Sequence, residues 1–237
     1  MKNLAHNPAS NRILVTLPSE VYEQLQPSLE QVTQTLKDVL QEPNVPMPYV
    51  YFPLSSVCSI LVQLEDDNTV EVATVGNEGM VGLPVFFGSA MMPTLTIVQV
   101  PGEALRMTEP AFKKAVNHLE PLRDLLQHYT QAMFMLIAQT AACNREHSIE
   151  QRCARWLMMT HDRVGANQFS LTQEFLAQML GVRRAGVNEV AGELQQEGLI
   201  QYSRGIITIT DRAGLEARAC ECYRIVNEEF ERSFKGA

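Results

Sequence analysis

Residues 171–210 read LTQEFLAQMLGVRRAGVNEVAGELQQEGLIQYSRGIITIT, and their pattern predicts two short helices followed by a β-hairpin. Thr172 suits the N-cap of the first helix, and Glu174 suits the positive end of its dipole. Gly181 permits a sharp turn, after which a second helix begins near Arg183. One apolar face on each helix predicts that the two pack together; these faces comprise Phe175, Leu176, Met179 and Leu180, then Val187, Val190, Ala191 and Leu194.

The polar face of the second predicted helix begins with Arg183 and Arg184. A purely structural helix favours acidic residues at this end, because the helix dipole is already positive there. Two arginines at this end are explained if phosphate groups or a guanine of a bound DNA lie in front of the helix. The alternative is that they are a pair of solvated charges without a binding role. Two β-rich runs then flank Ser203-Arg204-Gly205, which predicts a hairpin with Arg204 at its tip. Together these parts predict a winged helix-turn-helix that binds double-stranded DNA through Thr172, Gln173, Arg183, Arg184, Asn188, Glu189 and Arg204.

Composition and charge are compatible with this prediction. The chain has 237 residues, of which 46% are hydrophobic and 19% charged, as expected for a globular protein of two small domains. The net charge of −8 opposes DNA binding, but residues 148–214 hold seven basic and seven acidic residues. Because phosphate affinity depends on local cationic patches, a neutral domain with clustered arginines can still bind DNA. Five scattered cysteines, no membrane-length apolar stretch and no signal-peptide pattern predict a cytoplasmic protein without membrane contact.

The part of the chain that precedes this motif changes from helical to β-rich and back to helical. Residues 12–30 have helical spacing of apolar residues. Between about 33 and 108, short β-rich runs separated by turn-forming clusters predict a small sandwich or jelly roll. The runs are Thr33–Leu40, Tyr49–Phe52, Val57–Leu64, Thr69–Val75, Thr94–Val100 and Ala104–Met107. Residues 148–165 predict a further helix that ends at Gly165.

A long helix is predicted between residues 119 and 147. From Leu122 to His147, apolar or small residues alternate at spacings of four and three, which is the a/d pattern of a coiled-coil seam. We expect this seam to join two copies of the chain; a helix buried in the core of one chain is the alternative. The predicted dimer seam consists of Leu126, Tyr129, Met133, Leu136, Thr140 and Cys143.

The order of these parts resembles the CRP/FNR family of transcription regulators. The resemblance covers residues 12 to 215 and rests mainly on LTQEFLAQMLGVRR (171–184) and LQQEGLI (194–200). It implies an α+β fold with a cyclic-nucleotide-binding-like β-roll (12–118), a dimerisation helix (119–147) and a winged helix-turn-helix DNA-binding domain (148–237). Some members have Ser-Arg-Glu at the start of the recognition helix, where this chain has Arg183, Arg184 and Ala185. Arg184 matches the base-reading arginine, but Ala185 lacks the acid, so the half-site of those members cannot be assumed.

The predicted sensor domain lacks the residues with which cyclic-nucleotide members of the family hold the phosphate. The resemblance places Met80 where those members have a ribose-binding glutamate, and no arginine occurs between Val75 and Val100. A buried phosphate without a cation would be poorly compensated, so we expect neither cAMP nor cGMP to bind. The same region remains the expected effector pocket, with Met80, Gly82, Thr94 and Thr96. No cysteine precedes residue 50, and the β-rich residues 33–108 hold no histidine, which argues against iron–sulfur and haem sensing.

Other chemistry has weaker support in the sequence. Cys143 and His147 lie four residues apart near Cys153, a spacing that can ligate a metal, but core and seam positions explain them more simply. Cys220 and Cys222 are separated by one residue, too few for the usual metal knuckle; redox sensing is the alternative there. We therefore predict no metal and no cofactor, and the scattered histidines predict no enzyme active site.

The sequence thus predicts a dimeric, sequence-specific transcription regulator under allosteric control by an unidentified small-molecule or redox signal at the β-roll. Its expected partners are double-stranded DNA, a second copy of the chain and RNA polymerase. The alternative is a ligand-binding or scaffold protein whose winged helix contacts protein rather than DNA, which the neutral charge of residues 148–214 favours.

Overall fold

The computed structural model describes residues 11–65, 69–89 and 91–235. At its N-terminal end, the helix predicted over 12–30 is divided into α1 (Arg12–Thr16), α2 (Ser19–Leu25) and a 3-10 turn (Gln26–Ser28). Leu17 separates the first two because its ψ of 144° is extended, as the ring of the following Pro18 requires. The single helix is therefore wrong, although its apolar residues do face the core.

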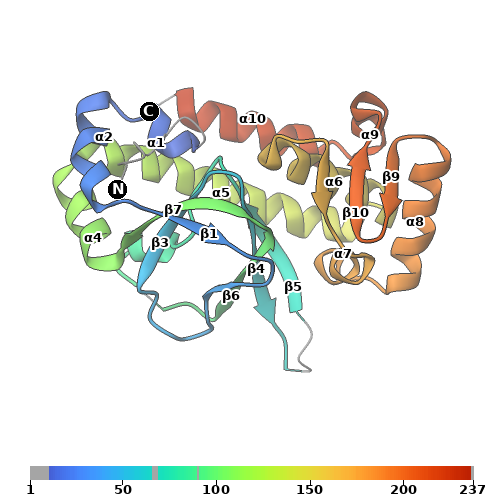
Figure 1. The fold of residues 1–237 in the computed structure, drawn as a ribbon, viewed down its shortest axis with the longest axis horizontal. Coiled ribbons are helices and arrows are strands. Elements are labelled where there is room, and N and C mark those ends of the chain that lie inside the picture. Colours follow the sequence, from blue (N-terminus) through green and yellow to red (C-terminus); the bar gives the residue numbers. More distant parts are fainter. Residues whose placement is uncertain (1–10, 66–68, 90, 236–237) are drawn as a thin grey trace.

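Two antiparallel sheets follow and form the β-roll (Figure 1). One has the order β1 (Glu30–Gln34), β7 (Gly102–Thr108) and β3 (Tyr49–Pro53). The other has the order β2 (Val39–Gln41), β6 (Thr94–Val100), β4 (Val57–Gln63) and β5 (Thr69–Val75). Two short helices, α3 (Leu83–Phe86) and α4 (Glu109–His118), complete this part. The predicted β-rich architecture is confirmed.

The expected strand Thr33–Leu40 is two strands that belong to different sheets. Lys37 has a φ of 69°, and the Asp38 carboxylate accepts a hydrogen bond of 2.6 Å from the Thr35 backbone N–H. These two features produce a turn after β1. The Thr35 N–H bonds to the Asp38 side chain, whereas in a continuous strand it would bond to a neighbouring strand. The chain therefore leaves one sheet at Gln34 and enters the other at Val39.

The long helix α5 (Glu120–Glu146) lies against the β-roll and extends to the C-terminal domain (Figure 1). The structure corrects the predicted dimer seam on this helix. Its apolar members are buried within a single chain, where α5 packs against β5 and α10 (Cys222–Lys235). A heptad stripe has the same pattern whether it meets its own chain or a second copy, so spacing alone could not distinguish the two. The buried members are Leu126, Tyr129, Met133, Leu136 and Cys143, while Thr140 is half-buried.

The C-terminal domain has the predicted helix–turn–helix and hairpin. Helix α6 (Ile149–Val164) begins with a capping box between Ser148 and Gln151. It is followed by β8 (Gln168–Ser170), α7 (Gln173–Leu180), α8 (Arg184–Gln196), β9 (Ile200–Ser203) and β10 (Ile206–Ile209), and the strands form one sheet in the order β8-β10-β9. Helix α9 (Arg212–Arg218) packs on α6. The predicted winged helix-turn-helix is confirmed.

The last helix, α10, returns along α5 towards the N-terminal helices (Figure 1). Near its end, Glu231 pairs with Arg12 of α1 at 2.7 Å, and the Arg12 guanidinium lies 4.4 Å from the centre of the Phe234 ring. This helix therefore connects the two ends of the molecule, although the sequence grouped it with the DNA-binding domain. Residues 236 and 237, at the end of that predicted domain, lie outside the described residues. No helix in the described ranges has the length and apolar character needed to span a membrane.

Candidate nucleic-acid interface

The first helix of the motif, α7, is positioned by its own caps. The Thr172 hydroxyl accepts a 3.1 Å hydrogen bond from the Phe175 N–H, and Glu174 lies in the first turn. Gly181 ends the helix with a φ of 62°, a left-handed conformation that glycine adopts without strain. Thr172 is exposed and Gln173 is half-buried, so both predicted DNA-contacting residues can be reached from outside the domain.

The second helix, α8, buries one face and exposes the other. Val187, Val190 and Leu194 are buried, as the apolar spacing predicts. Its N-cap residue, Arg183, makes no side-chain cap hydrogen bond, and no acidic residue lies in the first turn. On the outward face, the predicted DNA-contacting residues Arg183, Arg184, Asn188 and Glu189 are all exposed. The positive end of this helix thus presents two arginines to solvent.

The hairpin between β9 and β10 holds the third predicted arginine at its tip. Ser203 pairs with Ile206, so Arg204 and Gly205 are the two loop residues. Their φ values are 51° and 77°, and a loop with two positive φ values is the type I′ turn that matches the twist of paired strands. Arg204 is exposed. In Figure 1 this turn and the start of α8 both lie at the lower side of the C-terminal domain.

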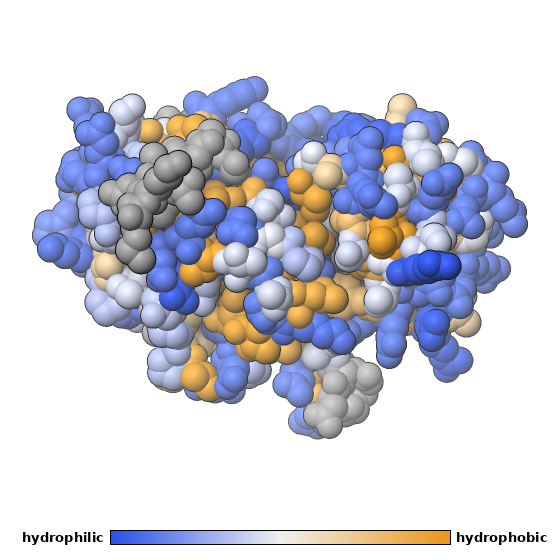
Figure 2. All heavy atoms as spheres, in the orientation of Figure 1, coloured by the Kyte–Doolittle hydropathy of each residue, from blue (hydrophilic) through white to orange (hydrophobic). Residues whose placement is uncertain are grey.

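Four other arginines between residues 148 and 214 have partners inside the protein. Arg152 donates to the Leu180 carbonyl, and Arg155 donates to the Thr140 hydroxyl at 2.9 Å. Arg163 and Arg212 pair with carboxylates, those of Glu78 and Asp162, each at 2.8 Å. Within the described ranges, Arg183, Arg184 and Arg204 have no carboxylate partner. The seven arginines of residues 148–214 therefore divide into four with internal partners and three unpaired ones around α8 and the hairpin. Figure 2 shows that the visible surface of this end of the molecule is mostly hydrophilic.

A second stripe on α5 faces away from the chain's own core. Phe134 is 69% exposed, Ile137 43% and Met135 36%, which is unusual for large apolar side chains on one helix face. The spacings of four and three also occur on this exposed side, a signal that the sequence interpretation missed. We call this set the outer stripe of α5: Gln127, Gln131, Phe134, Ala138, Ala141 and Arg145, all exposed.

The residues of the expected effector pocket are placed mainly in the core. Met80 and Thr96 are each 1% exposed, Thr94 is half-buried, and Gly82 with a φ of 103° begins α3. The Tyr129 hydroxyl of α5 donates to the Met80 carbonyl and accepts from the Met80 N–H at 3.1 Å. Met80 and Thr96 therefore serve packing in this structure rather than lining an open pocket.

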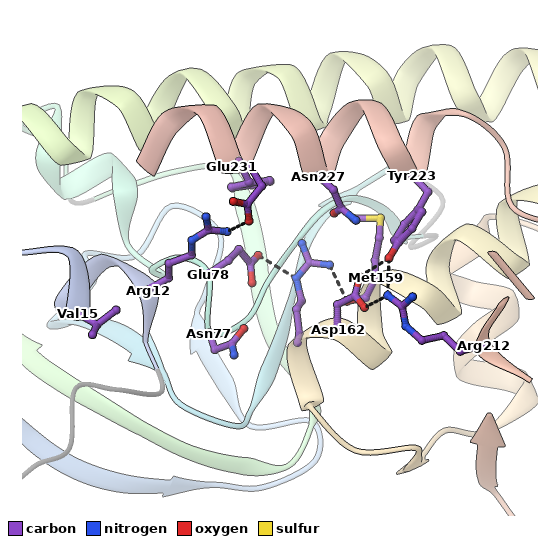
Figure 3. A pocket seen from close by; sticks show the side chains of 12 residues that line it. Arg12, Val15, Asn77, Glu78, Met159, Asp162, Arg212, Tyr223, Asn227 and Glu231 are labelled. Carbon is purple, nitrogen blue, oxygen red and sulfur yellow. Dashed lines mark hydrogen bonds and ion pairs between the residues drawn. The ribbon is translucent and has the colours of Figure 1, made fainter. Parts of the chain in front are cut away.

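A polar cavity of about 460 Å³ lies instead where the β-roll meets the C-terminal domain (Figure 3). The β-roll contributes Asn77 and Glu78, and α6 contributes Asp162 and Arg163. The Tyr223 hydroxyl also donates to the second carboxylate oxygen of Asp162 at 2.5 Å. Each cation of the lining pairs with an acid. Arg163–Glu78 and Arg12–Glu231 connect the N-terminal part of the chain to α6 and α10, whereas Arg212–Asp162 lies within the DNA-binding domain.

Glu71 of β5 makes a further connection between the two domains. It is 7% exposed, and its carboxyl oxygen accepts a 2.8 Å hydrogen bond from the Trp156 indole N–H of α6. Burial raises the pKa of Glu71 to about 7, although the Trp156 hydrogen bond and the charges of Arg163 and Arg155 oppose this shift. The buried carboxyl is therefore protonated more readily in the folded chain than in the unfolded one.

We expect Glu71→Gln to remove part of the pH dependence of stability. The folded-state pKa of about 7 exceeds the ordinary glutamate pKa of 4.5, so the folded protein binds more protons than the unfolded chain between these values. The unfolding free energy of the parent protein should therefore fall as pH rises through this window, by up to about 3 kcal/mol. The glutamine keeps an acceptor for Trp156 and does not ionise. Urea unfolding from pH 5 to pH 8 measures the difference; parallel curves for the two proteins would contradict the assignment.

Comparison with known proteins agrees with this geometry. Residues 151–218 match the family model of the Crp-like helix-turn-helix domain. The chain is 25% identical over 209 residues to the transcriptional regulator SdrP of Thermus thermophilus, covering 81% of this chain and 96% of that protein. It is 40% identical over 52 residues to the HTH-type transcriptional regulator Cmr of Mycobacterium tuberculosis, which is 22% of this chain and 21% of that one.

Solved structures agree at the level of the fold. A putative transcriptional regulator of the crp/fnr family from Eubacterium rectale superimposes with a TM-score of 0.65 at 17% identity, covering 90% of this chain and 97% of that one. The fold and the exposed basic surface define a helix-turn-helix DNA-binding protein. The chain has the fold of the CRP/FNR-type transcription regulators, with a Crp-like helix-turn-helix domain at residues 151–218.

Proposed function

We propose that this regulator binds DNA as a homodimer and reads two half-sites, one with each α8 helix. The observation that carries the proposal is the set of three unpaired, exposed arginines at the start of α8 and at the hairpin tip. Arg183 and Arg204 suit backbone phosphates, which fix the position of the protein on the duplex. Arg184, one residue into α8, suits a base edge in the major groove, as do Asn188 and Glu189 further along the same face.

The outer stripe of α5 supports the homodimer. Phe134 of the stripe and Ile137 beside it offer large apolar side chains, while Ala138 and Ala141 are small enough to let a second helix approach closely. A second copy of the chain, related by a two-fold axis, presents the same stripe and so covers it. The interface that we propose thus uses the same helix as the sequence prediction but its opposite face.

Control by a signal would act through the junction between the two domains. The Glu78–Arg163 pair and the Glu71–Trp156 hydrogen bond link the β-roll to α6, which packs against α8 of the DNA-binding motif. A ligand that favours one arrangement of this junction would shift the spacing of the two α8 helices in the dimer. We also propose that the protein acts in the cytoplasm and is not an enzyme. RNA polymerase is a further proposed partner, since such regulators act on transcription.

A salt-dependent titration of duplex DNA tests this function against the scaffold alternative. With Arg183 and Arg204 of both chains on phosphates, the logarithm of affinity should fall with the logarithm of salt concentration at a slope of roughly −4. Arg204→Asn should reduce this slope by about 2, because it removes one contact from each chain. Asparagine tolerates positive φ, so the type I′ turn is retained. Fluorescence anisotropy measures the slopes; salt-independent or undetectable binding would favour a scaffold.

A further inference from the structure

A cluster of three thiols and one imidazole lies where the C-terminal end of α5 meets the chain between α9 and α10. Cys143 and His147 come from the C-terminal end of α5, Cys220 lies between α9 and α10, and Cys222 is the first residue of α10. Their sulfur and nitrogen atoms all lie within 4.8 Å of one another. The structure therefore gathers two pairs of residues that the sequence interpretation considered separately, and it leaves Cys153 out of the group.

We propose that Cys143, His147, Cys220 and Cys222 bind one divalent metal ion of the zinc class in tetrahedral geometry. Zinc binds sulfur at about 2.3 Å and imidazole nitrogen at about 2.0–2.1 Å, so neighbouring ligand atoms of a tetrahedron are roughly 3.5–3.8 Å apart. The Cys143 and Cys220 sulfurs are 3.5 Å apart, and the Cys222 sulfur is 3.5 Å from His147 Nδ1. These separations leave room for an ion at the centre and are too long for a disulfide, whose S–S bond is about 2.05 Å.

The surroundings of the four residues fit a metal site as well. His147 Nε2 lies 3.2 Å from the Glu221 carboxylate, which leaves Nδ1 directed at the cluster. A metal-bound imidazole commonly donates its other ring N–H to a carboxylate in this way, because the bond fixes the ring and raises its basicity. The Gln139 amide donates a 3.1 Å hydrogen bond to the Cys222 sulfur, a contact that also suits a thiolate.

Burial and charge distinguish this site from a chance group of core cysteines. Cys143, Cys220 and Cys222 are 0%, 3% and 0% exposed, and they form a small cluster separate from the main apolar core. Three thiolates and a neutral imidazole around a divalent ion carry one net negative charge, and the buried Arg155 interacts with Cys143 and offsets that charge. Soft sulfur and nitrogen ligands in tetrahedral arrangement select zinc over harder cations.

The position of the site indicates what the ion would do. His147 is the C-cap of α5, and the next residue, Ser148, is the N-cap of α6, the first helix of the DNA-binding domain. The other two ligands lie just after α9, which packs on α6. One ion would thus hold the residues after α9 and the start of α10 against the residues that connect α5 to α6. The thiol protons leave to solvent as the ion binds, so loading would be favoured by higher pH.

Metal analysis of the purified full-length protein tests the proposal. We expect one zinc ion per chain, and we expect Co²⁺ added to the metal-free protein to give the visible absorption of a tetrahedral thiolate site. Cys222→Ser and His147→Gln should lose most of this binding, whereas Cys153→Ser should keep it. Cys153 is a matched control, because it is also buried in this region but its thiol, with a pKa raised by burial to about 12, is not in the cluster.

A second variant keeps the test valid if the cysteine substitutions prevent folding. Glu221 is exposed and only orients His147, so Glu221→Gln should fold normally and bind Co²⁺ about 10-fold to 100-fold more weakly. Addition of zinc should raise the melting temperature of the parent protein more than that of Glu221→Gln. Absence of bound metal with an unchanged melting temperature, a Cys143–Cys220 disulfide, or iron with acid-labile sulfide would each overturn the proposal.

Discussion

Phe134→Glu is expected to convert the dimer into folded monomers and to abolish tight DNA binding. Phe134 is 69% exposed in the single chain, so the glutamate is solvated in the monomer and does not disturb its core. In the dimer, the two-fold axis would bring two carboxylates together on facing helices, where they are desolvated without a partner. A monomer carries a single recognition helix, so affinity for DNA with two half-sites should fall by at least about 100-fold.

Light scattering and DNA binding together measure this effect. The mass should fall from that of two chains to that of one, 26.6 kDa, while circular dichroism stays unchanged. Phe87→Glu is a matched control, because Phe87 is 63% exposed but lies next to α3, away from α5. Met133→Glu, on the opposite face of α5, should instead unfold the chain, since Met133 is 5% exposed and packs in the core. A Phe134→Glu protein that remains dimeric would place the interface elsewhere.

Arg184→Ala is expected to relax the sequence preference at one base position in each half-site. Arginine forms two parallel hydrogen bonds with guanine O6 and N7, which contribute about 1–3 kcal/mol of discrimination per contact. Arg184 is exposed in the first turn of α8 and has no carboxylate partner among the described residues, so its removal should leave the fold intact. The loss therefore reports on DNA recognition rather than on stability.

Selection of binding sites from random duplex DNA, carried out on both variants, separates reading of bases from contact with phosphates. Arg184→Ala should select a motif that is degenerate at one position per half-site. Arg204→Asn should select the parent motif with lower affinity for every sequence, because a phosphate contact carries no sequence information. If Arg184→Ala selects the parent motif with undiminished affinity, the assignment of α8 as the recognition helix is wrong, and the scaffold alternative gains support.

Local signals in the sequence were sufficient for the DNA-binding motif. The Thr172 cap, the αL conformation of Gly181 and the Arg204-Gly205 turn each depend on a few neighbouring residues. Such preferences act over one turn of helix or one hairpin, so the order of helix, turn, helix and hairpin could be predicted without knowledge of distant contacts. The same holds for the β-rich character of residues 33–108, although the turn at Lys37 that divides the first run was missed.

Long-range packing decided the features that determine how the protein assembles. Both faces of α5 have residues spaced by four and three, and only the packing of β5 and α10 shows that the Leu126 face is buried while Phe134 is exposed. Seven arginines between residues 148 and 214 look equivalent in the sequence, yet four have internal partners and three do not.

The cluster of cysteines and His147 shows the same division most clearly. The two halves of the cluster, around Cys143 and around Cys220, are 77 residues apart in the chain. The sequence by itself indicated a spacing able to ligate a metal only around Cys143 and His147, and redox chemistry as the alternative at Cys220 and Cys222. Only the return of α10 along α5 brings the halves together, because a tetrahedral site needs all its ligand atoms within a few ångströms of one point. Sequence spacing determines the local geometry of a helix or turn, whereas contacts between distant segments depend on how all the buried surfaces fit at once.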